Sequence, residues 1–356
     1  MLLRYDAFFN PPLAMPRPAS PFDESFFDES FDENAPTLTP RMAIGLLLLT
    51  LLLTVLGGCE TVVDVNVPPH ERQLVAQGFF APESLWTVRV SHTVGYSEPT
   101  VPGLVEDAAV EIWEGDQLLE RLARRDSGTY IALGSRPELG RLYSLRVSAP
   151  GYETVEGGGA LPSPPQITAF EPALVSAPSE TRRIVRLRLI LDDLAGETNY
   201  YTLAVLHLRA LVDLQAGSVT SLPPALFPFT SDNPSLGNPL PNPLDPDSPT
   251  YYQALLRDDR FDGQAHTLDV EIAYDVASPP SPGPTVQRAF VVLFAALSED
   301  LYRYAKTAPE QALFGENPFA EPLRVYSNLS NGFGLFAGFS PRAFPVPPDS
   351  LLPVVP

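Results

Sequence analysis

In the stretch VRLRLIL, residues 185–191, every second residue is valine or leucine, and the residues between them are two arginines and one isoleucine. Successive side chains of a β-strand point to opposite faces. Val185, Leu187 and the two leucines that follow at the same spacing therefore share one face, while Arg186 and Arg188 point to the other. This pattern predicts a strand that is buried on one side and solvated on the other.

The stretch LDVEIAY, residues 268–274, repeats this alternation with acidic residues at two of the intervening positions. Strands with one buried and one solvated face are typical of antiparallel sheets. Working outward along the chain, we expect further strands at 73–80, 86–92, 109–114, 128–131, 142–147, 200–208 and 289–297. The last of these is apolar on both faces, which indicates a central strand.

Proline accounts for 41 of the 356 residues, about twice its usual share of ~5%. It lacks an N–H and fixes φ, so it interrupts helices and favours turns and strand edges. We therefore expect a mainly β chain with long loops at 217–250 and 278–284. One short helix is expected from a cap at Ser298 to about Ala308.

Turn residues separate the strands before residue 161 at near-regular spacing, which is typical of a β-sandwich. The proline-rich stretch 161–165 then predicts a domain boundary. The expected segments are an acidic leader (1–41), a signal peptide (42–58), a tether (59–71), a first β-sandwich domain (72–161), a second β-rich, sandwich-like domain (166–341) and a proline-rich tail (342–356).

The single cysteine, Cys59, directly follows an apolar run. Residues 44–56 carry no charge and fit the ~7–15-residue hydrophobic core of a secretory signal peptide. Leu56, Gly57 and Gly58 before the cysteine resemble the lipobox of bacterial lipoproteins, in which the cysteine is lipidated and becomes the new amino terminus. An uncleaved anchor is the alternative, although a spanning helix needs ~20 residues. One cysteine allows neither an internal disulfide nor a cysteine-based zinc site.

The segment before the apolar run does not look like the basic start of a signal peptide. It is acidic and repeats FDES at 22–25 and 27–30, and only Arg41 flanks the run. We expect either that translation begins downstream, near Met42, or that this leader is a disordered extension.

The charge balance of 23 basic and 43 acidic residues gives a net charge of −20. Seven acidic residues and three arginines precede Cys59, so the part after it has 20 basic and 36 acidic residues and a charge of −16. Phosphate binding needs a basic face, so nucleic acid is not an expected partner. Lys306 is the only lysine. Two explanations stay open: a GC-rich genome alone, or a high-salt habitat in which salt screens the acidic surface.

Motifs for catalysis, metals and cofactors are missing from the sequence. The histidines at 70, 92, 207 and 266 lie far apart, and none has metal-binding spacing on a helix. A G-x-S-x-G hydrolase elbow is absent. The glycines at 332, 334 and 338 do not match the dinucleotide fingerprint, and we expect them to permit close strand packing. We therefore expect no enzyme activity, no metal and no cofactor.

Asp258, Asp259 and Asp262 form an acidic turn. Carboxylates on one loop can supply some of the hard oxygen ligands that calcium needs. The spacing does not match an EF-hand loop, so a solvated acidic turn is the expectation.

The two tryptophans are expected to differ in environment. Trp86 shares a strand face with Val88 and Val90, which indicates a core position. Trp113 shares its face with Glu111 and points away from its apolar neighbours, which indicates the outer surface. Although single exposed aromatics are common, Trp113 is the candidate for ligand contact, for example by stacking on a sugar.

Short pieces of the sequence, in fixed order, resemble the family of lipoproteins described as domain of unknown function 4249. They lie at 59–60, 74–78, 107–112, 128–130, 143–147, 192–193, 199–201, 231–232, 301–304, 317–322, 325–328 and 331–338. The resemblance covers roughly residues 59–340, and the acidic leader departs from it.

This resemblance implies an outer-membrane lipoprotein of Gram-negative bacteria. It further implies an immunoglobulin-like β-domain followed by a second β-rich domain, and a role beside TonB-dependent outer-membrane receptors. It carries over no catalytic residues, because the family's biochemical function is not established.

Three functions follow as hypotheses. The first is a non-enzymatic outer-membrane lipoprotein that binds a ligand or partner as an accessory to an uptake receptor. The second is a structural or adhesive envelope lipoprotein. The third is a hydrolase with an unfamiliar site built from the carboxylates of residues 217–262.

Overall fold

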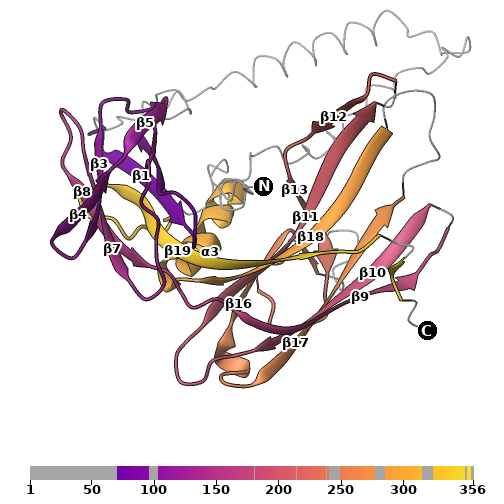
Figure 1. Cartoon of the computed structure of the whole chain (residues 1–356). Helices are drawn as coiled ribbons and strands as arrows, with labels where there is room; N and C mark the ends of the chain where they lie inside the picture. Colours follow the sequence, from indigo (N-terminus) through magenta and orange to yellow (C-terminus); the bar gives the residue numbers. More distant parts are fainter. Residues whose placement is uncertain are drawn as a thin grey trace, which may run out of the picture. The chain divides into compact units, whose positions relative to one another are not determined.

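The computed structural model describes residues 70–95, 103–179, 181–213, 215–237, 239, 249–276, 285–314, 324–348 and 351–353. Glu71–Pro356 belongs to one compact unit. The described chain is mainly β, as predicted, and its one α-helix is α3 (Glu299–Phe314) (Figure 1). No helix among the described residues has the length and apolar character needed to cross a membrane.

The largest sheet contains strands from both ends of the described part of the chain. Its strands are β1 (Leu74–Phe80), β2 (Thr87–His92), β5 (Ala123–Asp126), β6 (Thr129–Ile131), β11 (Tyr200–Asp213), β12 (Ser218–Ser221), β13 (Ala225–Phe227), β16 (Gln253–Arg257), β18 (Thr285–Leu297) and β19 (Phe333–Pro345). The order is β12-β11-β18-β19-β1-β2-β6-β5, and β13 and β16 pair with β11 beside this path. The predicted central strand, β18, lies between β11 and β19.

Two smaller sheets complete the fold. The first contains β9 (Gln166–Ser176), β10 (Arg182–Asp192), β14 (Phe229–Thr230), β15 (Thr250–Tyr251) and β17 (Ala265–Asp275), in the order β15-β14-β17-β10-β9. The second contains β3 (Ala109–Glu114), β4 (Gln117–Arg121), β7 (Leu142–Ser148) and β8 (Val155–Ala160), in the order β4-β3-β7-β8. A 3₁₀ helix, η2 (Asp258–Arg260), follows β16.

Strand β10 confirms the half-buried strand that the alternation at 185–191 predicted. The aliphatic residues at 185, 187, 189 and 191 are fully buried in one hydrophobic cluster with residues of β11, β17 and β18. On the opposite face, Arg186 and Arg188 lie directly across from acidic residues of β17. The Arg188 guanidinium is 2.8 Å from the Asp269 carboxylate, and that of Arg186 is 3.1 Å from Glu271.

A second hydrophobic cluster lies among β1, β2, β3 and β7 and contains Trp86, which is 1% exposed, as its strand pattern predicts. Leu329 and Phe336, from near the end of the chain, belong to the same cluster. The ring of Phe336 lies 4.7 Å from that of Phe80 and stacks on Trp86 at 5.8 Å. Residues more than 200 positions apart therefore build one core.

The connection between these regions is β19. It pairs in parallel with β1 and antiparallel with β18. Gly334 lies opposite Ala76 in the parallel pairing and has φ +118, a backbone conformation that residues other than glycine rarely adopt. A Cβ at Gly332, Gly334 or Gly338 would lie within 2.6 Å of a backbone oxygen of a neighbouring segment, which confirms the close strand packing expected for these three glycines.

The ends of several predicted segments differ from expectation. Within the expected loop at 217–250, β12, β13 and β14 form short strands. β19 continues to Pro345, and Leu352 is buried in the larger cluster, so part of the expected tail belongs to the core. Ser298 caps α3 as predicted, because its hydroxyl accepts a bond from the Leu301 N–H at 3.4 Å. The helix itself runs on to Phe314.

Candidate functional site

Trp113 is half-buried on the outer face of the sheet β4-β3-β7-β8. Its neighbours along β3, Val110 and Ile112, are fully buried beneath the sheet. The period-2 alternation of β3 thus presents the indole to the surface, because a residue next to a core position points the other way. The sequence placed Trp113 on this face for the same reason.

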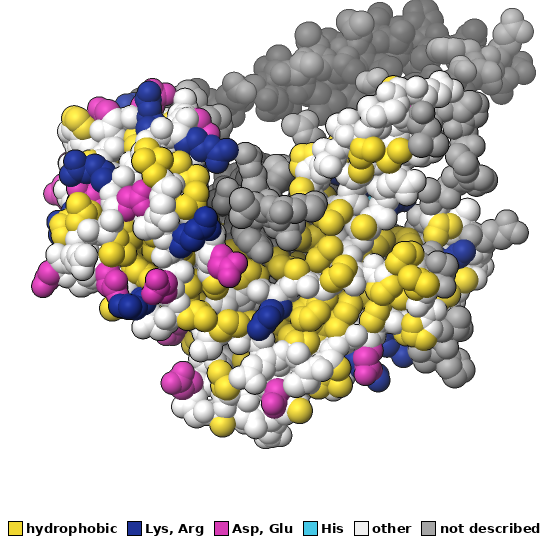
Figure 2. Space-filling model, viewed as in Figure 1, with side chains coloured by type: hydrophobic (Ala, Val, Ile, Leu, Met, Phe, Trp, Pro, Cys, Tyr) yellow, Lys and Arg dark blue, Asp and Glu magenta, His cyan; other side chains and the backbone are white. Residues whose placement is uncertain are grey.

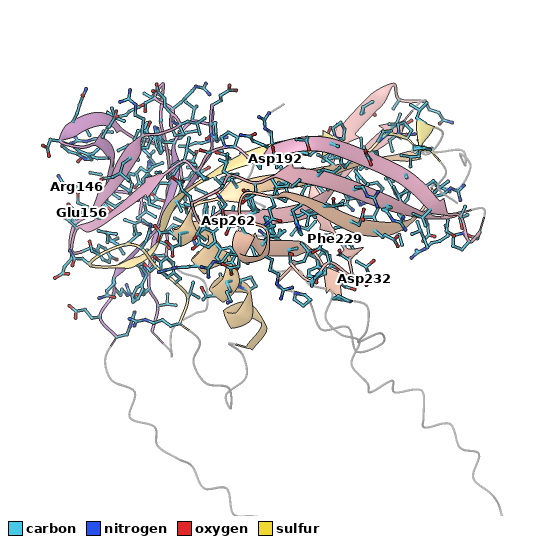
Figure 3. All side chains as sticks on the ribbon, turned by 90° about the horizontal axis from the view of Figure 1, so that it is seen from below. Arg146, Glu156, Asp192, Phe229, Asp232 and Asp262 are labelled. Atoms are coloured by element: carbon cyan, nitrogen blue, oxygen red, sulfur yellow. The ribbon has the colours of Figure 1, made fainter. Side chains whose placement is uncertain are left out.

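Charged residues of four neighbouring strands form a row beside Trp113. Arg121, Glu111, Arg146 and Glu156 lie across from one another in register on β4, β3, β7 and β8. The Arg121 guanidinium is 2.6 Å from the Glu111 carboxylate, and that of Arg146 is 2.7 Å from Glu156. Arg146 and Glu156 lie side by side in Figure 3, and Figure 2 shows basic and acidic side chains interspersed over the part of the molecule that contains β3, β4, β7 and β8.

Two contacts hold the indole of Trp113 in place. Its Nε1–H donates a hydrogen bond to Oε2 of Glu111 at 3.2 Å. The Cζ of Arg146 lies 5.1 Å from the ring centroid, within the range of a cation–π interaction. Because Glu111 and Arg146 are each also paired with another charged residue, the ring is held by an ion-paired frame.

A surface hollow of about 380 Å³ opens beside this ring. Its lining includes Trp113, Asp116, Ser144, Arg146, Glu156 and Gly157. Ser144 lies directly across from Trp113 on β7, and Gly158 of β8 lies across from Ser144. Ser144 and Gly157, which both line the hollow, are small and leave space beside the indole. The alternating burial of β7 places Ser144 and Arg146 on the outer face, but no local sequence pattern indicates that they lie beside Trp113.

A second and larger hollow, of about 570 Å³, lies at the end of the same sheet. Glu114, Glu138, Arg141 and Tyr143 are among the residues that line it. Arg141 lies 2.6 Å from the Glu114 carboxylate. Burial raises the pKa of the Tyr143 hydroxyl, which accepts a bond from the Glu138 N–H at 2.9 Å. Tyr143, the aromatic residue of this hollow, is only 2% exposed, so it offers no ring face to a ligand.

The acidic turn is more than the solvated turn expected from the sequence. Asp258 is only 2% exposed, and it joins Asp262 and Asp193, which is 6% exposed. One carboxylate oxygen of each lies within 4.8 Å of the others. Asp259 is turned away and pairs with Arg257 at 3.0 Å. The sequence missed Asp193, because it lies 65 positions before Asp258 and meets it only through the fold.

Each carboxylate of this cluster already accepts hydrogen bonds from its own chain. The Tyr201 hydroxyl donates to Asp193 at 2.6 Å, and the Gly263 N–H donates to the same carboxylate at 3.0 Å. Asn199 donates its backbone N–H to Asp258 at 2.7 Å. These bonds tie the β10–β11 turn to η2. Three carboxylates can also bind a hard cation, but this donor set is engaged in holding the turn.

Burial dominates the electrostatics of the cluster. It raises the pKa of Asp258, and the nearby Asp193 carboxylate raises it further. Burial and the Asp193 carboxylate together raise the pKa of the Tyr201 hydroxyl well above its usual range. The pKa of His266 is lowered by burial, and its ring stacks on Phe261 at 4.1 Å.

An Asp258→Asn variant is expected to raise stability at pH 7 by about 1 kcal/mol, or roughly 2–4 °C in Tm. The amide can still accept the Asn199 bond but removes a buried charge beside Asp193. A carboxyl whose folded pKa is raised stabilises the fold fully below its unfolded pKa and loses that contribution as pH rises through the folded value. The gain over wild type should therefore shrink as pH falls from 7 toward 4.

Thermal melts followed by circular dichroism at several pH values measure this difference. Asp259→Asn is the matched control, because that carboxylate pairs with Arg257 at the surface and should change Tm little. An equal gain from both variants, or a gain that does not depend on pH, would contradict the prediction.

The hydrolase hypothesis needed the carboxylates of 217–262 to converge. Asp258 and Asp262 converge with Asp193, whereas Asp232 and Asp259 do not join them. Positions 245 and 247 lie outside the described residues. The aspartate cluster is the one group of three or more metal-ligating side chains within the described ranges, and no histidine belongs to it.

Cys59 and the preceding Leu56, Gly57 and Gly58 lie outside the described residues. The comparison with family models finds a match over residues 60–343 to a family described as "Domain of unknown function (DUF4249)". The comparison with curated proteins finds no match.

Proposed function

The chain belongs to the DUF4249 family, and from that premise we propose that it is a lipoprotein held at the outer membrane by lipid on Cys59. In this proposal its β-rich body is a binding module without catalytic activity. It serves as an accessory component beside a TonB-dependent uptake receptor.

The observation that carries the proposal is the position of the family match relative to the only cysteine. The match begins at residue 60, one position after Cys59. An uncharged apolar run and a pair of glycines precede that cysteine. The matched region is therefore the segment that lipidation at Cys59 would leave attached to the membrane.

Two features of the described body support a binding role. Trp113 borders an open surface hollow, and Arg146 and Glu156 line the same hollow. Polar groups that converge around an aromatic ring in a concave surface are typical of ligand sites.

A Cys59→Ser variant tests the anchor. In a Gram-negative host, the wild-type protein should fractionate with the outer membrane and carry a mass increase from acyl chains. The serine variant should lose both, because an alcohol does not replace the thiol that forms the lipid linkage. Thr61→Ala, two residues later, is the control and should keep the anchor. Membrane retention of the wild-type protein at its uncleaved, unmodified mass would contradict lipidation and favour an uncleaved anchor.

Purification of the lipidated protein in a mild detergent, followed by mass spectrometry of what comes with it, tests the accessory role. The proposal predicts a stoichiometric outer-membrane receptor in the eluate. If the lipidated protein is recovered alone, the accessory role fails. Changed cell attachment after deletion, with unchanged nutrient uptake, would then indicate a structural or adhesive lipoprotein.

A further inference from the structure

The hollow beside Trp113 has a chemical character that points to one class of ligand. Its charges are largely balanced, because the Arg146 guanidinium is 2.7 Å from the Glu156 carboxylate. A strongly anionic ligand would approach both Glu156 and Asp116, and a cation would displace or repel Arg146. The hollow therefore suits a neutral ligand.

The polar groups that line the hollow favour neutral ligands that carry several hydroxyl groups. The carboxylates of Asp116 and Glu156 accept hydrogen bonds only, whereas the guanidinium of Arg146 donates only. A hydroxyl group both donates and accepts, so a ligand with several hydroxyls can satisfy both kinds of group at once. The exposed Ser144 adds a hydroxyl of its own between Trp113 and Gly158.

The indole ring of Trp113 is the third feature that points to the class of ligand. Trp113 offers an apolar surface whose orientation is held by Glu111 and Arg146. Across the row, the Cβ position of Gly158 is open except for ordinary contact with the Tyr143 carbonyl at 3.6 Å. A sugar ring, with apolar C–H faces and hydroxyl groups at its edges, matches this combination, and the hollow of about 380 Å³ lies within the size range of small-ligand sites.

We infer that the outer face of the sheet β4-β3-β7-β8 binds a neutral oligosaccharide, with one sugar ring packed against the part of the indole of Trp113 that Arg146 leaves exposed, and its hydroxyls bonded to Arg146, Glu156 and Asp116. This inference rests on the proposed binding function and names the ligand class for it. The hollow is open and shallow, so single-site binding is expected to be weak and a chain of several sugars is the appropriate probe.

Tryptophan fluorescence reads out this site directly, because the chain has two tryptophans and Trp86 is 1% exposed. The full-length protein is held in a detergent without a sugar headgroup. It is titrated with maltohexaose, cellohexaose, xylohexaose, mannohexaose and hexa-N-acetylchitohexaose, each to about 10 mM, which detects millimolar affinity. At least one of these should give a saturable shift in emission, confirmed by calorimetry.

Three variants separate the site from the rest of the surface. Trp113→Ala should raise the dissociation constant measured by calorimetry at least about tenfold, because it removes the stacking surface. Ser144→Leu should do the same by filling the hollow. Leu133→Ala, at a leucine that is 79% exposed, lies outside the lining and should bind as wild type does.

Absence of saturable binding to all five oligosaccharides would overturn the inference, and so would unchanged affinity in Trp113→Ala. The result is independent of the receptor experiment. Saccharide binding without a copurifying receptor supports the inference while removing the accessory role. A copurifying receptor without saccharide binding removes the inference and leaves the accessory role standing.

Discussion

Gly334→Ala is expected to lower the free energy of unfolding by about 4 kcal/mol, or roughly 10 °C in Tm. Gly334 has φ +118, and a Cβ at this position would lie 1.9 Å from the carbonyl oxygen of Ala76. The contact is with backbone, so no side-chain rotation relieves it. Relief requires β19 to move away from β1, which would disrupt the parallel pairing between them.

Thermal melts by circular dichroism measure this effect, with Gly158→Ala as the matched control. Gly158 also lies in a strand, but a Cβ there meets only the Tyr143 carbonyl at 3.6 Å, an ordinary contact. Its replacement should leave Tm unchanged or slightly raised, because alanine loses less backbone entropy on folding. Similar losses in the two variants would show that the β1–β19 contact is not the cause.

Asn328→Ala is expected to cost about 3 kcal/mol, because one half-buried amide bonds three separate parts of the fold. Its Nδ2 lies 3.0 Å from the Gly158 carbonyl of β8 and 3.1 Å from the Asp300 carboxylate of α3. Its amide also lies 2.9 Å from both the carbonyl and the N–H of Phe336 on β19. Alanine would leave these partners without their bonds, and the partly buried ones on α3 and β19 have only limited access to water in exchange.

Chemical denaturation with urea measures this loss as a change in midpoint at constant slope. Ser330→Ala, two residues along, removes one exposed hydroxyl bond of 3.1 Å to the Glu156 carbonyl and should cost about 1 kcal/mol or less. The Asn328 prediction fails if both variants shift the midpoint equally. A fall in the slope for Asn328→Ala would instead indicate that the β8, α3 and β19 regions unfold separately.

The predictions for Gly334 and Asn328 concern segments that resemble the family but whose structural role the sequence does not reveal. Residues 325–328 and 331–338 belong to the pieces that resemble the family, and their roles emerge only in the fold. Asn328 joins β8, α3 and β19, and Gly334 lets β19 approach β1. An isolated asparagine or glycine belongs to no periodic pattern, so contacts of this kind cannot be predicted from the sequence.

Local patterns, by contrast, were sufficient for the strands with a clear alternation, such as β3, β10 and β17, but they gave no signal for β9 or β19. The alternation at 185–191 and at 109–114 gave both the β class and the outward direction of Trp113, because the side-chain period of a strand is a property of neighbouring residues. The cap at Ser298 was equally readable, since a hydroxyl bonds an N–H only three residues away.

The sequence by itself therefore determined the mainly β class and the buried and exposed faces of the strands that alternate clearly, and it predicts the lipid site at Cys59. Only the tertiary structure decided that β19 lies parallel to β1, that Asp193 joins Asp258, and that Arg146 lies over Trp113. The physical reason is that the first group depends on short-range periodicity and composition. The second depends on strand register and on contacts between residues far apart in the chain, which become defined only when the whole core packs.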